Sequence, residues 1–445
     1  MNKYFKKIIE HGLYIIVFLL SLQARLFIRN GEIEGGFSEY LTISLYGVDI
    51  LLLIIILLNG FIFLRELKAK KFDFKISKLL YLIGGLDLIV FISIFFAEDK
   101  ILALYKYSIF LLGIGLFWLI AGASYNKAKL LWSFLAGIIL QTCLGIWQFL
   151  MQSSFANKWL GLAMHDSSDL GVSVIEVIGS DGVWERWLRA YGGFDHPNIL
   201  GGVMAIGLLV LLNLYLKNSN LITGQSGFQK IKQYLLLTAY ILMFMALIFS
   251  FSRAAWLGFI VGIIILSFIL VIQKKYYQQK ELLIIILISV ALTSLIYSQY
   301  SNLFQTRLSI NSRLENISYA ERVSSINDSK IIIKDNFLFG TGIGNYALEL
   351  DNNTINSHPS WYYQPVHNAF LLVWSELGIF GLLFFALLLV YLLFNSYKNK
   401  KYFNIVIILS LITIMMFDHW WWSLHFGVLF WWFVMGMVYR DNKFV

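Results

Sequence analysis

Cysteine and charge are both scarce in this sequence of 445 residues. The one cysteine, Cys143, lies in an apolar run, so the chain has neither a disulfide framework nor a set of thiolate metal ligands. Charged residues make up 14% of the chain, whereas a soluble domain typically has about 25%. Hydrophobic residues make up 59%, more than one water-facing globule could bury. We therefore expect lipid to be the solvent for most of the chain.

The positive net charge of +9 could indicate a nucleic acid as a partner. In membrane proteins, however, Lys and Arg accumulate in cytoplasmic loops. With the N-terminus inside, each predicted inside segment of this chain is basic and the short outside loops are not. The charge therefore indicates orientation in a membrane, and we expect membrane lipid but no nucleic acid among the partners.

Apolar runs of about twenty residues recur along the sequence, and each is long enough for a helix that crosses a bilayer. The N-terminal run resembles a signal peptide, but no small-residue cleavage site precedes Arg25, so we expect a retained first span. The sequence thus predicts an all-α, polytopic membrane protein with about twelve transmembrane helices. The predicted spans are 12–28, 47–64, 79–97, 101–122, 130–151, 198–216, 233–250, 254–273, 282–298, 368–395, 402–417 and 420–438.

The whole chain, 1–445, is expected to form a single integral membrane domain with both termini in the cytoplasm. Two long loops then face the opposite, outer side. The first covers 152–197. The second covers 299–367, where a helical pattern, RLENISYAERVSSINDSKIIIKDN, is followed by a Gly-rich turn, GTGIGNY. Long loops on a compact protein tend to carry function, so we expect the functional residues on the outer side.

The segment RAYGGFDHPN lies just ahead of the predicted sixth span and contains Arg189, His196 and Asn198. Pro197 fits the first position of a helix, where its missing N–H costs nothing. His196 could therefore either contact the start of that helix or act in catalysis, and both explanations stay open. No local role of this kind accounts for Arg189.

Two further arginines are candidates for function. Arg253, in SFSRAAWLG, lies in a hinge between two predicted spans. An arginine at that depth either snorkels to the surface or faces a polar cavity with an anionic partner, and we favour the second explanation. Arg322, in YAERVSS, lies on the predicted loop helix, where it is either a solvated residue or a functional one.

The segment QPVHNAFLLVWSELGIFG places His367 and Asn368 at the outer mouth of the predicted tenth span. A histidine titrates near neutral pH and can accept a proton from a hydroxyl, although it can also be an ordinary interfacial residue. A metal site formed by His367, Asp418 and His419 is conceivable, but no ligand spacing such as HExxH supports it. We therefore expect no metal.

We also expect no cofactor. GTGIGNY loosely resembles a dinucleotide-binding loop, but it lacks a preceding strand, a following Lys-Ser/Thr and a cytoplasmic position. The arginines instead indicate an anionic ligand, because guanidinium forks match the oxygens of phosphate and pyrophosphate. An anionic, amphipathic ligand at the outer leaflet would be a lipid pyrophosphate.

The ordered set RAYGGFDHPNILG, SFSRAAWLG, the Arg322 helix with GTGIGNY, and VHNAFLLVWSELGIFG resembles the O-antigen ligase and polymerase superfamily, over roughly 80–440. This resemblance implies a GT-C-like bacterial inner-membrane enzyme. Such an enzyme transfers a glycan, with inversion, from undecaprenyl pyrophosphate without metal or nucleotide sugar. It further implies that Arg189 and Arg253 neutralise the pyrophosphate, that Arg322 assists, and that His367 is the general base or orients the acceptor. His196, Asn198 and Asn368 are then expected to help bind substrate.

The acceptor stays open at this point. A ligase transfers the glycan to lipid A–core, a polymerase to another lipid-linked repeat, and relatives to a protein hydroxyl. A secondary transporter or lipid flippase is the alternative from another class, and Asp87, Lys106 and Glu376 would be its mid-membrane charges. The long outer loops make the two halves of the chain unlike, which favours the transferase.

Overall fold

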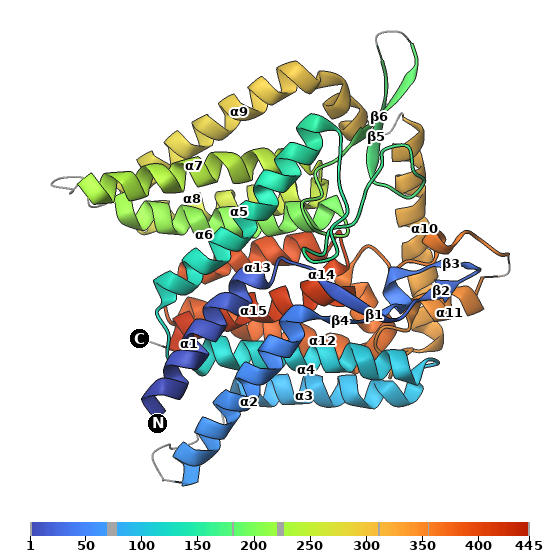
Figure 1. Ribbon diagram of the computed structural model, residues 1–445, viewed down its shortest axis with the longest axis horizontal. Coiled ribbons are helices and arrows are strands. Elements are labelled where there is room, and N and C mark those ends of the chain that lie inside the picture. The colour runs from blue at the N-terminus through green and yellow to red at the C-terminus, as the bar shows by residue number, and fades with distance from the viewer. Residues whose placement is uncertain are drawn as a thin grey trace. The chain divides into compact units, whose positions relative to one another are not determined.

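The protein is described by a computed structural model that covers residues 2–68, 78–179, 182–219, 227–309, 312–354 and 356–443 (Figure 1). Most of these residues are helical, because a helix satisfies its own backbone hydrogen bonds in lipid. The helices are α1 Asn2–Leu19, α2 Gly47–Lys68, α3 Lys78–Ser93, α4 Lys100–Gly122, α5 Lys127–Met151, α6 Pro197–Ser219, α7 Gly227–Phe249, α8 Arg253–Ile272, α9 Tyr276–Leu308, α10 Arg313–Asp335, α11 Tyr346–Asn352, α12 Ala369–Lys398, α13 Tyr402–Met415, α14 Trp420–Ser423 and α15 His425–Lys443.

Each of the twelve predicted spans overlaps one of these helices. Within the described ranges, nine helices are long and apolar enough to cross a membrane. They are α2, α3 with the short 3-10 turn that follows it, α4, α5, α6, α7, α8, the helical segment that begins with α9, and α12. The apolar helix α13 is shorter, and α1 and α15 are not among the nine. The chain is thus a mostly helical, polytopic membrane protein, and the count of twelve stays a prediction.

The structure also contains short strands that the all-α prediction did not include. They are β1 Arg25–Arg29, β2 Glu32–Ile33, β3 Gly36–Phe37, β4 Ile43–Tyr46, β5 Val174–Ile178 and β6 Trp184–Leu188. They pair antiparallel as β1 with β4, β2 with β3 and β5 with β6. The predicted first span, 12–28, was therefore wrong at its C-terminal end: α1 stops at Leu19, and the apolar residues after Arg25 belong to β1.

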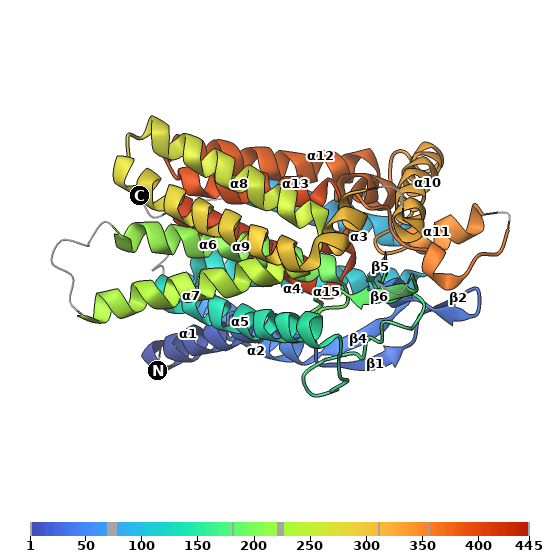
Figure 2. The same cartoon turned by 90° about the horizontal axis from the view of Figure 1, so that it is seen from above.

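The chain packs as two compact units. Unit 1 comprises Met1–Phe134, Arg322–Lys401 and Met415–Val445. In it α15 packs on α4, α12 on α3, and α1 on α2. Figures 1 and 2 both show α1 beside α2. Close approach of α4 and α15 depends on Gly113, which faces the indole of Trp432. Unit 1 is thus built from helices that are far apart in the sequence. The single-domain expectation concerned the membrane domain as a whole and stays a prediction.

Unit 2 comprises Leu135–Glu321 and Tyr402–Ile414, so the division falls inside α5 and α10. Its central helix is α6, which packs against α7, α8 and α9 and is buried over most of its length. Small residues allow the close contacts: Gly207 lies against Ile138 and Met243. Similarly, Ser410 of α13 donates a hydrogen bond to the carbonyl of Gly258 in α8. These contacts fix the N-terminal ends of α6 and α8, where the candidate residues of unit 2 lie.

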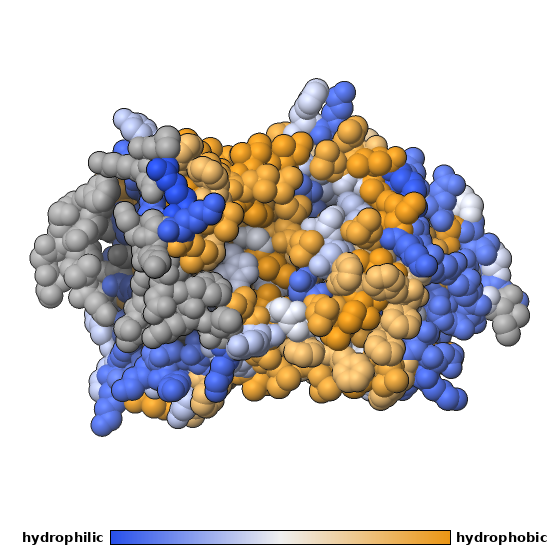
Figure 3. Space-filling view, turned by 90° about the horizontal axis from the view of Figure 1, so that it is seen from below, coloured by the Kyte–Doolittle hydropathy of each residue, from blue (hydrophilic) through white to orange (hydrophobic). Residues whose placement is uncertain are grey.

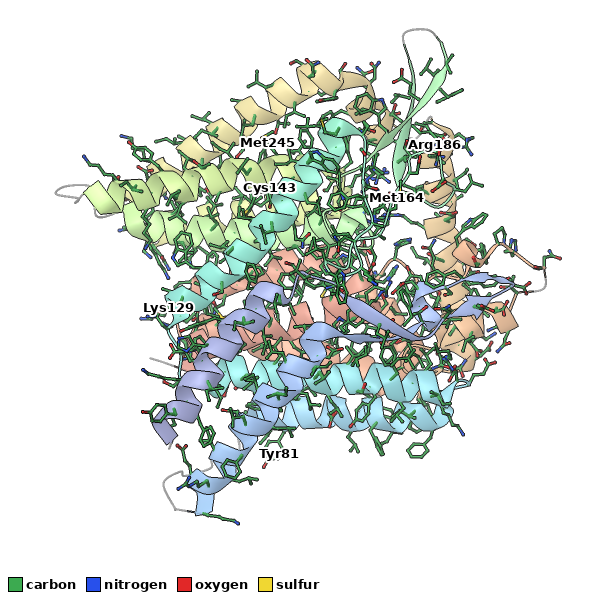
Figure 4. All side chains as sticks on the ribbon, viewed as in Figure 1. Tyr81, Lys129, Cys143, Met164, Arg186 and Met245 are labelled. Atoms are coloured by element: carbon green, nitrogen blue, oxygen red, sulfur yellow. The ribbon has the colours of Figure 1, made fainter. Side chains whose placement is uncertain are left out.

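Many large apolar side chains remain exposed on the outer faces of the helices, as expected of surfaces solvated by lipid. One face of the protein shows broad hydrophobic areas of this kind (Figure 3). Tyr81 on α3 and Cys143 on α5 are among the exposed side chains (Figure 4). Cys143 is therefore a lipid-facing residue rather than part of a buried packing contact.

Candidate active site

In unit 2 the first candidate, Arg253, is the first residue of α8. The chain turns between α7 and α8 through Phe251, which has a positive φ of 46°, and Ser252 then caps α8 by accepting a hydrogen bond from the N–H of Ala255. This short turn places Arg253 at the helix N-terminus with 35% of its side chain exposed. A guanidinium there is held by the helix start yet remains accessible to a ligand.

Arg253 belongs to a three-residue ionic cluster with Arg307, in the last turn of α9, and Glu315, in the first turn of α10. Glu315 is buried and forms an ion pair with Arg307, while its other oxygen lies 3.2 Å from Nη2 of Arg253. Arg253 also donates to the backbone carbonyl of Arg307 at 3.4 Å. One carboxylate therefore stands between two arginines, an arrangement in which a phosphate would find two guanidinium groups already assembled.

Sequence reasoning missed Arg307 and Glu315. Both lie in the predicted outer loop, where a charged side chain looks solvated, whereas the structure buries both. The helical pattern after 313 was the available signal, because it implied that the charged residues near its start would be ordered. α10 does cover Arg313–Asp335.

Arg189 has a different environment from Arg253. It is 3% exposed, and its guanidinium donates hydrogen bonds to the carbonyl of Ser250 at 2.8 Å, to Oγ of Ser173 at 2.6 Å and to Oδ1 of Asn198 at 2.8 Å. A buried charge needs such partners to offset its lost hydration. Arg189 therefore ties the end of α7 to the start of α6, and Asn198 is one of its acceptors.

His196 makes the helix-start contact that the sequence left open. Its Nδ1 accepts a hydrogen bond from the backbone N–H of Asn198 at 3.1 Å, as α6 begins at Pro197. In unit 2 the structure thus brings together Arg189, Asn198 and Ser250. This group is joined to Arg253 through the Ser250–Ser252 turn.

The backbone ahead of α6 is held by two glutamines of α5. Gln148 accepts hydrogen bonds from the N–H groups of Tyr191 and Gly192 and donates one to the carbonyl of Gly192. Gln141 accepts from the N–H of Gly193 at 2.6 Å. Gly192 has a φ of 62° and leaves no room for a side chain beside the carbonyl of Gln141. This accounts for the glycine pair between Arg189 and His196.

In unit 1 His367 lies in a compact group with Asp418 and His419. The ring centres of the two histidines are 5.1 Å apart, and Asp418 and His419 are buried. Nδ1 of His419 lies 2.8 Å from Oγ of Ser423. Nδ1 of His367 is buried and has no hydrogen-bond partner within the described ranges. A buried nitrogen without a partner is uncommon, and a hydroxyl that formed a hydrogen bond with it would displace no protein partner.

Burial determines the protonation of both histidines. It lowers the pKa of His367, an effect that Asp418 opposes and that the charge of Arg322 reinforces. It lowers the pKa of His419 to about 3, with the neighbouring His367 adding to the effect. Both rings are therefore neutral at neutral pH, and a neutral imidazole is the form that accepts a proton. Arg322, on α10, is close enough to His367 and His419 to influence both.

Asn368 caps α12. Its Oδ1 accepts hydrogen bonds from the N–H groups of Phe370 and Leu371, and its Nδ2 donates to the carbonyl of Met416 at 3.1 Å. These bonds satisfy orphan donors at the helix start and fix the position of the preceding His367.

Two of the three charges predicted to lie mid-membrane, Lys106 and Glu376, have protein partners in unit 1. Nε1 of Trp422 donates to Glu376 at 2.7 Å, and Lys106 donates to the carbonyl of Ser423 at 3.2 Å. Both line a cavity of about 20 Å³, room for roughly one water. The Gly-rich turn GTGIGNY packs here: Gly340, with a φ of 71°, abuts the backbone of Glu376, where any Cβ would overlap it.

His367, Asp418 and His419 are also residues of the types that bind metal ions. The donor atoms of His367, Asp418 and His419 lie within 4.8 Å of one another, the spacing of a potential cation site. However, Nδ1 of His419 is already engaged with Ser423, and the positive charge of Arg322 acts on both histidines. A cationic neighbour disfavours a bound cation. The group fits a neutral base better than a metal centre.

Comparison with known families identifies part of the chain. Residues 238–386 match the O-antigen ligase family. This segment is therefore similar to the O-antigen ligase family. The match covers about a third of the sequence and includes Arg253, Arg307, Arg322 and His367, so both clusters contribute residues to it. A multi-pass membrane protein of the O-antigen ligase type agrees both with this match and with the nine apolar helices of the described ranges. Among curated proteins, none matches the chain.

Proposed function

We propose that this protein transfers a glycan, with inversion and without metal, from undecaprenyl pyrophosphate to an acceptor hydroxyl at the outer face of the bacterial inner membrane. The proposal rests on one observation: Arg253 and Arg307 both form ion pairs with the carboxylate of Glu315, and all three residues lie in the segment that matches the family. That arrangement supports an anion-binding role in a family of lipid-linked glycan transferases.

The leaving group is the lipid pyrophosphate. As the bond between the anomeric carbon and its phosphate oxygen breaks, negative charge grows on the pyrophosphate. The two guanidinium groups, which Glu315 holds side by side, stabilise this charge once the phosphate takes the place of that carboxylate. Arg253, the more exposed of the two, contacts the phosphate in this proposal. Arg189 acts from its buried position by holding the Ser250 turn that precedes Arg253.

The acceptor side is assigned to His367. The acceptor oxygen attacks the anomeric carbon from the face opposite the pyrophosphate, and its proton passes to the neutral imidazole of His367. A new glycosidic bond forms, and undecaprenyl pyrophosphate leaves. Arg322 supports this cluster through its charge, and Asn368 fixes the position of His367. His196 and Asn198 shape the donor side.

We propose lipid A–core as the acceptor, which makes the protein an O-antigen ligase. The second candidate is a polymerase, with a lipid-linked repeat as acceptor. Both transfers use the same donor chemistry, so the sizes of the products distinguish them. In a secondary transporter or flippase, by contrast, no glycosidic bond would form.

The test is transfer in proteoliposomes that contain an undecaprenyl-pyrophosphate-linked glycan, with chelator present and no nucleotide. We expect release of undecaprenyl pyrophosphate by the wild type. The rate should fall about 10²–10³-fold in Arg253→Ala, because a transition-state donor is lost, and by at least about 10²-fold in His367→Ala. Arg65→Ala and His11→Ala, at exposed sites outside both clusters, serve as matched controls and should behave as the wild type.

Absence of release by the wild type would refute the transferase, and a flux assay would then test the transporter. Equal activity of the wild type, Arg253→Ala and His367→Ala would instead refute the assigned residues. Dependence of activity on a divalent metal would refute the metal-free mechanism and direct attention to His367, Asp418 and His419.

A further inference from the structure

Unit 2 contains a second feature, a cavity of about 710 Å³ between α7, α8 and α9. Its size lies in the range of cavities that bind organic ligands. The closed wall is formed by buried residues of α7, including Tyr240, Phe244 and Leu247. The other two sides are formed by α8 and α9.

The wall of this cavity is mostly apolar. Its residues are mostly aliphatic and aromatic, and three of its hydroxyls, those of Tyr240, Ser289 and Thr293, have hydrogen-bond partners within the protein. Ser289 and Thr293 donate to carbonyls one turn earlier in α9, and the Tyr240 hydroxyl lies 2.8 Å from Oγ of Ser289. A polar ligand would find few partners on these walls, whereas an apolar chain would lose none.

One side of the cavity is open. Ile260 and Ile264 of α8 and Val290 of α9 line it, yet these side chains are 52%, 60% and 57% exposed. Exposed aliphatic residues on membrane-spanning helices face lipid. A hydrocarbon chain can therefore enter the cavity from the bilayer, between α8 and α9, without passing through water.

The cavity extends to the ionic cluster. Trp256 lines it one helical turn, about 4.5 Å, after Arg253, while Phe304 and Leu308 line it on either side of Arg307. From Arg253 to Ile264 the distance along α8 is about 16 Å. A ligand that fills both sites has an anionic end joined directly to a hydrocarbon body of that length.

We propose that this cavity binds the first isoprene units of a polyprenyl chain whose pyrophosphate lies at Arg253 and Arg307. The inference rests on the proposed function and extends it to the lipid part of the donor. A polyprenyl pyrophosphate has its phosphate attached directly to the chain, which matches a hydrocarbon wall that starts within one turn of Arg253. A phospholipid has a glycerol and two esters at this point, and the mostly apolar wall offers them few polar partners.

Chain-length dependence tests the proposal. The same glycan is offered to the protein in nanodiscs on undecaprenyl pyrophosphate and on a single-isoprene pyrophosphate. We expect the wild type to have a KM for the long donor that is lower by about tenfold or more, since each buried methylene contributes to binding. In Ile260→Trp and Val290→Trp, which fill the cavity, the KM for the long donor should rise to near that for the short one.

The matched control is Leu257→Trp, on α8 and 41% exposed but not part of the cavity lining. It should retain the wild-type preference for the long donor. Equal KM values for both donors in the wild type would overturn the proposal. The same would follow if Leu257→Trp and Ile260→Trp lost the preference equally. Unfolding temperatures of all variants show whether each is folded.

A binding measurement separates this inference from the proposed function. Retention of glycan-free undecaprenyl pyrophosphate by the full-length protein is measured by mass spectrometry, with phosphatidylglycerol as competitor. We expect retention by the wild type, a loss of about tenfold in Ile260→Trp, and weak competition. Equal competition by phosphatidylglycerol would identify an ordinary lipid site and overturn the proposal. Specific binding without any transfer would support the cavity while refuting the proposed function.

Discussion

At the scale of single residues, Glu315 has the least expected position. It is buried between Arg253 and Arg307, in the place that the phosphate of a donor would occupy. Breaking a buried ion pair by removing its charge is costly, because the opposite charges lose their partner. We therefore expect Glu315 to stabilise the protein without ligand and to compete with the proposed anionic ligand.

The variant Glu315→Gln tests this competition. We expect a lower unfolding temperature without ligand, and a fall of the donor KM on the order of fivefold, equivalent to about 1 kcal/mol. Added inorganic pyrophosphate should raise the unfolding temperature of this variant more than that of the wild type. Glu321→Gln, six residues further along α10, is the control. An equal rise in the wild type, Glu315→Gln and Glu321→Gln would show that the carboxylate does not compete.

The lowered pKa values of His367 and His419 predict the dependence of stability on pH. An unfolded histidine titrates near 6.5, whereas His419 has a pKa of about 3 in the folded protein. Between these two pKa values the unfolded chain therefore binds more protons than the folded protein. The contribution of the neutral histidine to the free energy of unfolding is fully present above pH 6.5 and is lost as the pH falls below that value. We expect the unfolding temperature to decrease from pH 7 to pH 5. His419→Gln should flatten this decrease, and His11→Gln, at an exposed site, should leave it intact.

Sequence reasoning identified charged residues that lie beside apolar runs. Arg253 and His367 were found in this way, and both lie at helix starts, Arg253 with 35% of its side chain exposed and His367 with a buried, unpartnered Nδ1. The sequence could not distinguish residues that bind substrate from residues that only hold the site in shape. Asn198 and Asn368, for example, form structural hydrogen bonds with partners that are not their neighbours in the sequence. It also could not reveal Arg307, whose burial follows from tertiary packing alone.

At the scale of elements, hydrophobic periodicity predicted the helices well and the strands not at all. Helix α10 agrees with the helical pattern from 313 to 336, because charged and apolar residues alternate there with helical spacing. The pairs β1–β4 and β5–β6 have strands of four or five residues, too short for a periodic signal. For the same reason the run from α1 into β1 looked like one span.

The packing of the Gly-rich turn against α12 gives a prediction for stability. Gly340 has a positive φ, and a Cβ there would overlap the backbone of Glu376. We expect Gly340→Ala to lower the free energy of unfolding by more than about 2 kcal/mol, measured by denaturation in detergent. Gly60→Ala in α2, where a Cβ meets nothing within 4 Å, should be neutral or stabilising. Equal effects of both substitutions would mean that the turn tolerates side chains.

At the scale of the whole molecule, each compact unit has its own chemistry. Unit 2 contains Arg189, Arg253, Arg307 and the apolar cavity, whereas unit 1 contains Arg322 and the cluster of His367, Asp418 and His419. Hydropathy predicted the membrane class because it depends on composition, which needs no knowledge of packing. The two units could not be predicted, because each combines segments from distant parts of the sequence.

Orientation in the membrane is testable with cysteine labelling. In a Cys143→Ser background, Trp159→Cys lies in the loop predicted outside and Lys129→Cys in the loop predicted inside, and both positions are exposed. We expect a membrane-impermeant maleimide to label Trp159→Cys on intact spheroplasts and Lys129→Cys only after permeabilisation. The reverse pattern would invert the topology and place the proposed chemistry on the cytoplasmic side.

The two glutamines of α5 have a consequence for protein engineering. The loop that contains Arg189 receives its shape from amides that lie more than forty residues earlier. A carboxylate in place of Gln148 would lack the N–H that the Gly192 carbonyl requires. Transplanting the RAYGG loop alone into another scaffold would therefore not reproduce its conformation, and a successful graft has to include the facing turns of α5.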